Sequence, residues 1–401
     1  MCYNSRMNKT PAIIILSSVI HKPFDIMLAG ILRYAHEHGP WRIYQVERRK
    51  WMYAFDAWAS WGADAIIAAD HHDIDEANKI KDMKVPVIVL LQPQGMRTKD
   101  YPLRNFPCCL WNSAKIGQMA ADYFCRKGFT NFAFVDDTIK TTYWSVDRER
   151  AFRKALPKGS HYRRYGGATE DERTDWMSER PRLAKWLRAL PKPCAVFAPN
   201  DRRGKQVLDA AFSEGIPVPG DISVLACDND TWICDASIPT LSSIRCDTET
   251  AGYNIAAILD DMLHGKKPKT RIEVPVDPIE VVTRQSTDWN AVGDEKVAQT
   301  LARIQADFSN PDLCVNDLAR ASGLARRTLE VRFKNTTGRT IREEIEFFRL
   351  SKAKSLLTEN KLSITAIAKS IGYTSAAQFC LRFKLALGCT PGQFSKKILS
   401  K

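Results

Sequence analysis

The sequence of 401 residues lacks the patterns that mark several large classes of protein. No apolar run approaches the roughly 20 residues of a membrane-spanning helix. The run Ile13–Leu16 is also too short for the core of a signal peptide. The sequence contains no G-x-S-x-G, no P-loop and no G-x-G-x-x-G after its first predicted strand. These absences argue against a membrane protein and against the enzyme classes that such motifs mark.

Metal-binding and disulfide patterns are missing as well. The eleven cysteines include no C-x-x-C pair, and all seven histidines precede residue 265. We therefore expect no metal site and no cofactor. The adjacent Cys108 and Cys109 cannot easily pair in ordinary disulfide geometry. An odd number of thiols without a disulfide framework predicts a reducing compartment, the cytoplasm.

Positive charge is abundant, and it is unevenly distributed. The formal net charge is +13, and residues 291–401 carry 19 Lys and Arg against 10 Asp and Glu. The other 290 residues carry 40 against 36. An excess on one segment fits a nucleic-acid-binding face. A solvated basic surface would give the same imbalance, so charge alone does not decide between the two.

The C-terminal segment contains one pattern twice, with a separation of 50 residues between Phe333 and Phe383. Each copy reads as a helix with a small Ala, a Gly-centred turn and a second helix with a polar outer face. This pattern predicts two helix-turn-helix motifs, at about 315–335 and 364–385. The second helix of such a motif enters the DNA major groove. Between the copies, Ile341–Leu357 reads as one helix of about 25 Å.

The outward positions of the two predicted recognition helices are candidate DNA contacts. Arg can bond guanine bidentately, Glu can accept from cytosine, and apolar side chains can contact thymine methyls. The candidates for base contacts are Arg326, Arg327, Glu330, Ser375 and Gln378. Lys334, Arg382 and Lys384 are expected to contact phosphates, which position the protein without specifying sequence. Leu329 and Phe333 recur as Phe379 and Phe383 and are predicted to be buried.

From residue 10 to about 285, short apolar runs alternate with amphipathic stretches. Predicted strands are Ala12–Leu16, Arg42–Val46, Ala65–Ala69, Pro86–Leu91, Asn131–Val135, Cys194–Ala198 and Ile222–Cys227. Predicted helices are Phe24–His38, Ser113–Lys127, Arg148–Leu156, Gly204–Glu214 and Glu249–His264. This alternation predicts an α/β region of parallel sheets covered by helices.

The length of the α/β region favours two successive lobes over one sheet. We expect the chain to change lobe near 107–112 and to return near 241–245. The segment Val274–Asn290 reads as an irregular connection, with a linker at 286–291. A separate all-α domain is then predicted over 292–397.

Polar side chains follow several predicted strands. Asn200 and Asp201 come after Cys194–Ala198, Asp228 comes after Ile222–Cys227, and Arg148 lies beyond Asn131–Val135. Ligands of α/β folds bind where the carboxyl ends of the strands meet. Carboxylates, amides and an Arg suit a polyhydroxylated ligand, whose hydroxyls both donate and accept. Alternatively, Asp201 and Asp228 cap helices and Arg148 is a surface cation.

The second C-terminal copy resembles the DNA-binding domain of the AraC/XylS family. The residues that carry this resemblance are Ile367-Ala368, Gly372-Tyr373, Phe379, Arg382-Phe383-Lys384, Gly388, Thr390-Pro391 and Phe394. Two helix-turn-helix motifs at this spacing, followed by Gly-x-Thr-Pro, are specific to that family. The resemblance covers roughly residues 292–397 and implies binding to double-stranded operator DNA.

The N-terminal region resembles the LacI-type and periplasmic sugar-binding fold. The matching pieces are Asn200-Asp201 with Gly204, Val224–Asn229, Pro239–Ile244, and Gly252 with Leu259–Leu263. A LacI-like sensor joined to AraC-type readers is the layout of the xylose operon regulator subfamily, which the chain resembles over nearly its whole length. That resemblance implies a homodimeric activator that responds to a sugar effector, D-xylose, and acts with RNA polymerase.

The resemblance also assigns roles within the sensor. Arg148 matches the Arg that holds sugar hydroxyls, and Asp201 and Asp228 match the carboxylates that accept from them. Asn112 stands where the family has a polar residue, usually Asp, on the hinge side. The remaining candidate ligand contacts are Asn200, Phe24 and Asp25.

The first-lobe candidates have competing interpretations. Phe24 and Trp111 either stack on the apolar face of a sugar or belong to the core. The run Lys22–Met27 replaces a run containing Arg-Gly in the subfamily. Two alternatives therefore remain: a regulator of the same architecture that responds to a different sugar, metabolite or protein partner, and a sugar-acting enzyme with a DNA-binding appendage.

Overall fold

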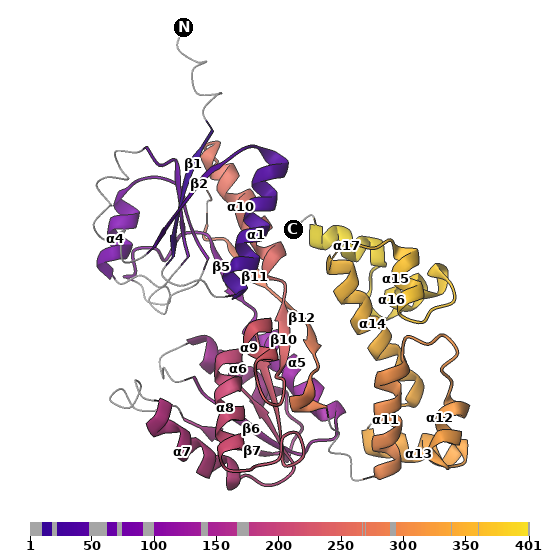
Figure 1. Cartoon of the computed structure of the whole chain (residues 1–401). Helices are drawn as coiled ribbons and strands as arrows, with labels where there is room; N and C mark the ends of the chain where they lie inside the picture. The colour runs from indigo at the N-terminus through magenta and orange to yellow at the C-terminus, as the bar shows by residue number, and fades with distance from the viewer. Residues whose placement is uncertain are drawn as a thin grey trace. The chain divides into compact units, whose positions relative to one another are not determined.

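The computed structural model describes residues 10–17, 22–47, 62–69, 74–90, 100–137, 143–166, 176–266, 268, 270–288, 294–337, 339–359 and 361–399 (Figure 1). The chain forms two compact units, one of Met1–Asn112 with Asp247–Asp277 and one of Ser113–Cys246 with Pro278–Lys401. No helix within the described residues is both long and apolar enough to cross a membrane.

The first unit is built on a parallel sheet with the strand order β11-β5-β4-β3-β1-β2. Its strands are Ala12–Ser17 (β1), Arg42–Glu47 (β2), Ala65–Ala68 (β3), Val87–Val89 (β4), Cys108–Trp111 (β5) and Glu273–Val276 (β11). Its described helices are Lys22–His38 (α1), Ile74–Asp82 (α4) and Thr248–Leu263 (α10). The central strands β3 and β4 are apolar and buried along their whole length, as expected for parallel strands.

Two glycines allow helices α1 and α10 to pack closely. A Cβ atom at Gly30 would lie 2.0 Å from the backbone oxygen of Glu249. A Cβ atom at Gly252 would lie 1.9 Å from the backbone oxygen of Met27. Both distances are far below van der Waals contact, so any larger residue would force the two helices apart.

The second unit contains a second six-stranded sheet with the order β12-β10-β9-β8-β6-β7. Its strands are Asn131–Val135 (β6), His161–Tyr165 (β7), Cys194–Phe197 (β8), Ile222–Cys227 (β9), Ser242–Cys246 (β10) and Pro278–Val282 (β12). The described helices of residues 113–288 in this unit are Ser113–Arg126 (α5), Tyr143–Ala155 (α6), Trp176–Arg188 (α7), Asp201–Ser213 (α8), Thr231–Asp235 (α9) and the 3-10 helix Gln285–Thr287 (η3). We call residues 113–246 and 278–288 the second lobe.

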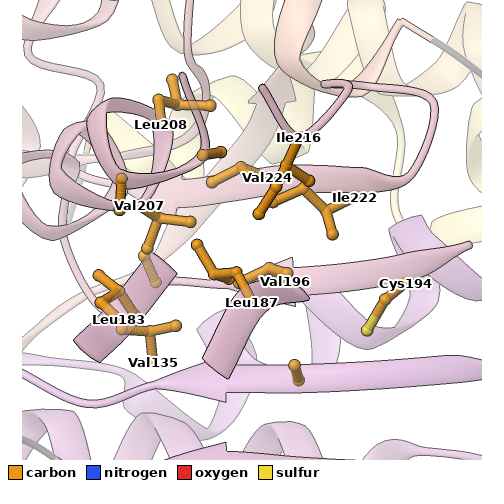
Figure 2. Close-up of a cluster of buried hydrophobic side chains, with 14 of the residues drawn as sticks. Val135, Leu183, Leu187, Cys194, Val196, Val207, Leu208, Ile216, Ile222 and Val224 are labelled. Atoms are coloured by element: carbon orange, nitrogen blue, oxygen red, sulfur yellow. The ribbon is translucent and has the colours of Figure 1, made fainter. Parts of the chain in front are cut away.

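The core of the second lobe lies between its sheet and helices α7 and α8. Figure 2 shows Leu183 and Leu187 of α7 and Val207 of α8 beside Val196 and Val224 of the central strands. These side chains are completely buried. Burial of large aliphatic side chains of this kind contributes about 1.5–3 kcal/mol each. The sheet whose strand ends carry the predicted site therefore rests on a rigid apolar layer.

The remaining residues, 294–399, form an all-α region that we call the reader domain. Its helices are Glu295–Asp307 (α11), Val315–Ser322 (α12), Arg326–Thr337 (α13), Ile341–Glu359 (α14), Ile364–Ser370 (α15), Ala376–Leu387 (α16) and Pro391–Leu399 (α17). It has two separate cores. Helix α14 contributes Ile341 and Ile345 to the first core and Leu350, Ala353 and Leu357 to the second. The predicted helix Ile341–Leu357 is confirmed, and it connects the two halves.

The predicted strands and helices are confirmed with small shifts at their ends. The largest shift concerns the helix predicted at Arg148–Leu156, which begins five residues earlier at Tyr143. Leu91, the last residue of the strand predicted at Pro86–Leu91, lies outside the described residues. Helix ends depend on capping contacts that the apolar pattern alone does not reveal.

The prediction of an irregular connection over Val274–Asn290 is wrong. Residues Glu273–Val276 and Pro278–Val282 form β11 and β12, the edge strands of the two sheets. Their prolines are tolerated because an edge strand leaves part of its backbone unpaired. Ser286 and Thr287, assigned to the linker, are completely buried in the second lobe. The linker predicted at 286–291 therefore begins two residues too early, and its residues 289–291 lie outside the described part of the chain.

The chain passes between the units three times. It leaves the first unit after Asn112, returns at Asp247 and leaves again after Asp277. The first two changes lie at or just beyond the predicted positions, 107–112 and 241–245. The third was missed, because it lies between the two unrecognised edge strands.

Candidate functional site

A cluster of polar side chains lies at the carboxyl ends of the strands of the second lobe. Strand β8 leads into helix α8, whose first turn contains Asp201. Strand β9 leads into Asp228 and Asn229. Arg148 reaches the same region from helix α6. The sequence predicted Asp201, Asp228 and Arg148 as one group, and the fold brings all three together.

Asp201 is almost completely buried, with 2% of its surface exposed. One carboxylate oxygen accepts from the Ser243 hydroxyl at 2.5 Å, and the other accepts from the Asp230 backbone N–H at 2.6 Å. The helix cap is Asn200, whose side-chain oxygen accepts from the Arg203 backbone N–H at 2.8 Å. The interpretation of Asp201 as an ordinary helix cap is therefore wrong. Asp201 instead holds the loop after β9 in place, and Asn200 takes the capping role.

Arg148 is 3% exposed, so it is not a surface cation. Its guanidinium donates to the Pro199 carbonyl oxygen and lies 3.7 Å from a carboxylate oxygen of Asp228. It also lies over the ring of Trp144, 5.2 Å from the centroid. Its Nε–H has no acceptor among the described residues. A guanidinium has five donors, so Arg148 can bond further oxygens in this cluster.

The loop that follows β9 has an unusual backbone. Asp228 and Asn229 have φ values of 110° and 51°, a region that residues other than glycine seldom adopt. The Ser243 hydroxyl accepts from the Asn229 backbone N–H at 3.0 Å, and Arg284 donates to the Asn229 side-chain oxygen at 3.0 Å. These bonds hold the strained loop in place. The carboxylate of Asp228, in that loop, faces Arg148. Strain of this kind is typical of functional sites.

Sequence reasoning missed Ser243 and Arg284 as parts of this site. Ser243 lies in the motif Pro239–Ile244, which was recognised as a whole and not residue by residue. Arg284 is 42 to 55 residues away from its partners Ser242 and Asn229 in the sequence. A polar residue inside a buried strand, such as Ser243, is the signal that was available.

Burial also changes the acidity of the two carboxyl groups. Burial raises the pKa of Asp228 to about 6, and the nearby Arg148 opposes that rise. Burial and the neighbouring Asp228 raise the pKa of Asp201 well above its usual range. Perturbed carboxyl groups beside a buried Arg are typical of binding sites. The arrangement can bind a neutral polyhydroxylated molecule through charge-assisted hydrogen bonds.

A buried ion pair lies beneath the first turn of α8. The Arg203 guanidinium bonds both carboxylate oxygens of Glu179 on α7, at 2.6 and 3.1 Å. Its Nε–H donates to the Asp136 carbonyl oxygen at 2.7 Å. Arg203 is 1% exposed. These bonds tie α8, α7 and the end of β6 together and fix the backbone that carries Asp201.

The other predicted contacts lie in the first unit. The Asn112 side chain donates to Asp277 at 2.8 Å, and these are the last residues of the two segments of that unit. Phe24 is 4% exposed within α1, so the interpretation as a core residue holds. Asp25 is exposed in the first turn of α1, and Trp111 is half-buried at the end of β5. Each of these residues has a place in its own unit.

The first helix-turn-helix consists of α12 and α13. The turn begins at Gly323, whose φ of 71° ends α12. Leu329 and Phe333 are completely buried, as predicted. Arg326 and Arg327 are exposed on α13, but the Arg326 guanidinium bonds Glu330 at 3.1 Å. Of the two, Arg327 is therefore better placed to reach DNA, because Glu330 holds the side chain of Arg326.

The second helix-turn-helix consists of α15 and α16. Phe379 and Phe383 are completely buried, as predicted, while Gln378, Arg382 and Lys384 are exposed. The Ser375 hydroxyl accepts from the Gln378 backbone N–H at 3.2 Å and so caps α16. In the first copy, Lys334 is likewise exposed.

The two copies also contact one another. A Cβ atom at Gly372 would lie 2.9 Å from backbone atoms of Phe308 and Ser309. Arg349 of α14 donates to the carbonyl oxygens of Phe308 and Asn310, both at 2.8 Å. The turn of the second copy thus packs on the loop before the first.

Comparison with known proteins agrees with this architecture. The periplasmic binding protein-like domain model matches residues 121–287, and the helix-turn-helix domain model matches residues 318–397. The xylose operon regulatory protein of Haemophilus influenzae is 30% identical over 82% of this chain and 84% of its own length. That of Escherichia coli K12 is 30% identical over 83% of this chain and 84% of its own length. The chain belongs to the xylose operon regulatory protein family.

A solved structure supports the same assignment. The structure of xylose-binding transcription activator XylR covers 97% of this chain and 98% of its own, at 27% identity and a TM-score of 0.61. The predicted fold class is confirmed: a two-lobed, periplasmic-binding-protein-like α/β sensor followed by an all-α domain with two helix-turn-helix motifs. This xylose operon family member is a sugar-responsive, DNA-binding transcriptional regulator and not an enzyme.

Proposed function

We propose that this protein is a cytoplasmic activator of pentose-utilisation genes that binds D-xylose in the second-lobe cluster. The observation that supports it most is the group of buried Arg148, buried Asp201 and half-buried Asp228 at the carboxyl ends of one sheet, in the same chain as a double helix-turn-helix. A sugar hydroxyl donates to the carboxylates and accepts from the guanidinium. Relatives bearing the name xylose operon regulatory protein make D-xylose the first effector to test.

The alternative effector is another sugar or metabolite, because the run Lys22–Met27 at the start of α1 departs from the subfamily. Calorimetry of the full chain against D-xylose, other pentoses and hexoses would separate the two. A dissociation constant for D-xylose at least about tenfold below the others supports the proposal. If a different compound binds more strongly, that compound is the effector. If no sugar binds, sugar sensing at this site is overturned.

The DNA target can be found with the protein itself. A duplex selected by the full-length chain from a random-sequence pool, here called the selected duplex, should contain two separate base-specific segments. Helix α14 is 19 residues long and spans about 28 Å, so the two recognition helices can enter major grooves about one helical turn apart. We propose hydrogen-bonded readout through Arg327 and a softer, more apolar contact by α16, which exposes Leu381.

Replacing Arg327 by alanine should weaken binding of the selected duplex by about 1–3 kcal/mol and relax the preference at one base position. A base contact has this effect because the guanidinium bonds guanine bidentately. Fluorescence anisotropy with single-base variants of the duplex measures it. The matched control is Arg303→Ala, which removes an exposed Arg from α11. A uniform loss across all base variants would assign Arg327 to a phosphate instead.

Sugar affinity should depend on pH through Asp228. Its raised pKa of about 6 means that the empty site binds a proton as the pH falls through that value. The carboxylate form accepts from a hydroxyl, so affinity is full above about pH 7 and about tenfold weaker at about pH 5. Calorimetry across this range tests it. Asp228→Asn should weaken binding and remove the pH dependence, whereas persistence of the dependence in that variant would point to Asp201.

A homodimer on two half-sites is a further part of the proposal. Trp232 of α9 and Ile238 are large apolar side chains that are 82% and 72% exposed. We propose that these two side chains contact a second copy of the chain. Analytical ultracentrifugation of Trp232→Ser should show dissociation at concentrations where the unchanged protein is dimeric. An unchanged dimer would place the interface elsewhere. As an activator, the DNA-bound dimer would act on RNA polymerase.

A further inference from the structure

Helix α14 of the reader domain lies against the second lobe, within one compact unit. Its contacts are with strand β12 and with the end of helix α5. Helix α14 also supplies residues to both cores of the reader domain. Any movement of this helix relative to the second lobe therefore moves both recognition helices together.

The first set of contacts is a polar cluster on β10 and β12. The Arg245 guanidinium donates to the Ser355 hydroxyl oxygen at 2.6 Å and lies 2.9 Å from a carboxylate oxygen of Glu280. The Ser355 hydroxyl donates to the same oxygen of Glu280 at 3.0 Å. Ser355 is 1% exposed. Three residues separated by up to 110 positions in the sequence thus form a closed triangle of bonds.

The second set of contacts surrounds the ring of Phe347 on α14. The guanidinium of Arg126, the last residue of α5, lies 3.7 Å from the ring centroid, and that of Arg339 lies 5.6 Å from it. Glu344, one turn earlier on α14, is almost completely buried and lies 4.0 Å from Arg339. Burial raises the pKa of Glu344, and Arg126 and Lys127 of the second lobe counter that rise.

Both sides of this contact therefore contribute charge. Burial lowers the pKa of Arg126 to about 10 and that of Lys127 to about 8, and Glu344 opposes both shifts. Charged groups regain their hydration when an interface opens, so ion pairs and cation–π contacts separate at a modest net cost. An apolar interface of the same area would cost more free energy to open, because its side chains gain no hydration on exposure. This composition is suited to a contact that opens and closes.

Strand β10 links this contact to the predicted sugar site. Its residue Ser243 holds Asp201 and the Asn229 backbone. Two residues further along the same strand, Arg245 bonds Ser355 of the reader domain. Ser243 at the predicted sugar site and Arg245 at helix α14 are thus joined by one short segment of extended chain.

We propose that the contact of α14 with the second lobe, formed by Arg245–Glu280–Ser355 and by Arg126–Phe347–Glu344, is the connection through which the sugar site controls the two DNA readers. The inference rests on the proposed function and adds the route of regulation. A ligand shifts an equilibrium between two states only to the extent that its affinities for those states differ. Here the two states are α14 docked on the second lobe and α14 released.

The test measures the affinity of full-length variants for the selected duplex, with and without saturating D-xylose. The variants are Ser355→Ala, Arg126→Met and Glu344→Gln, and the matched control is Lys352→Met, an exposed residue of the same helix. The ratio of the two affinities is the coupling factor. We expect it to fall from about tenfold in the unchanged protein toward one in the three variants. Sugar affinity should stay within about twofold.

Hydrogen exchange of α14 peptides reports docking without any ligand. Faster exchange in Arg126→Met and Glu344→Gln than in Lys352→Met supports the contact of α14 with the second lobe, and equal exchange in all three variants overturns that contact. A coupling factor unchanged in all three variants overturns the regulatory role. An unchanged protein that binds no sugar and selects no duplex overturns the proposed function instead, while the exchange result still decides whether α14 is docked.

Discussion

Replacing Arg148 by methionine should weaken D-xylose binding by about 2–5 kcal/mol, or by about thirty-fold to several thousand-fold. Arg148 is 3% exposed and lies 3.7 Å from Asp228. Its removal takes away the donors that a sugar oxygen accepts from, and it leaves the half-buried carboxylate of Asp228 without a counter-charge. The pKa of Asp228 should then rise further, because Arg148 holds it down. At neutral pH more of the Asp228 carboxyl group would then be protonated, and a protonated carboxyl group is a weaker acceptor for a sugar hydroxyl than a carboxylate.

Calorimetry with D-xylose measures this loss. The matched control is Arg150→Met, which removes an exposed Arg from the same helix, where it pairs with Asp147 at 3.5 Å. That control should bind sugar as the unchanged protein does, and both variants should bind the selected duplex without sugar. Retention of sugar affinity in Arg148→Met would make Arg148 a structural residue and move the binding site away from this cluster.

Replacing Arg203 by methionine should lower the free energy of unfolding of the second lobe by about 3–5 kcal/mol. The change leaves Glu179, 2% exposed, as a buried charge with its bidentate partner removed. It also removes the donor to the Asp136 carbonyl oxygen. Isolated buried charges are costly, so most of the loss comes from Glu179 and not from the absent Arg.

Urea unfolding followed by circular dichroism measures the effect, and a second variant tests its cause. Arg203→Met combined with Glu179→Leu should recover much of the stability, because two apolar side chains of similar size can replace a buried ion pair. The control Lys205→Met breaks an exposed pair with Asp209 on the same helix and should cost only about 0.3–0.5 kcal/mol. Equal losses in Arg203→Met and Lys205→Met would contradict this account.

The reader domain shows how far local patterns reach. Each helix-turn-helix is defined by residues close together in the sequence: an apolar spacing, a turn glycine with positive φ such as Gly323, and a buried Phe one turn after another apolar residue. These features act within about twenty residues, so their spacing predicted both motifs and the helix that joins them. Which exposed Arg is free to reach DNA depended on side-chain contacts, such as the bond of Arg326 to Glu330.

The sensor shows where local patterns fail. Strands β11 and β12 contain Pro275 and Pro278 and are only four and five residues long, so this Pro-bearing segment was taken for a connection. Their identity as strands comes from partners more than a hundred positions away for β11 and more than thirty for β12. Pairing over such separations is decided by the whole fold. The same cause hid the third change of unit and the buried position of Ser286.

By itself, the sequence determined the class of the protein: two α/β lobes, two helix-turn-helix motifs, and acidic and basic residues at the ends of particular strands. Those properties follow from periodicity and from residue type, which are local. The tertiary structure decided what each residue does. It made Asn200 the cap of α8, turned Asp201 toward Ser243, and placed Arg245 against Ser355. Such roles depend on burial and on partners distant in the chain, and a linear pattern contains neither.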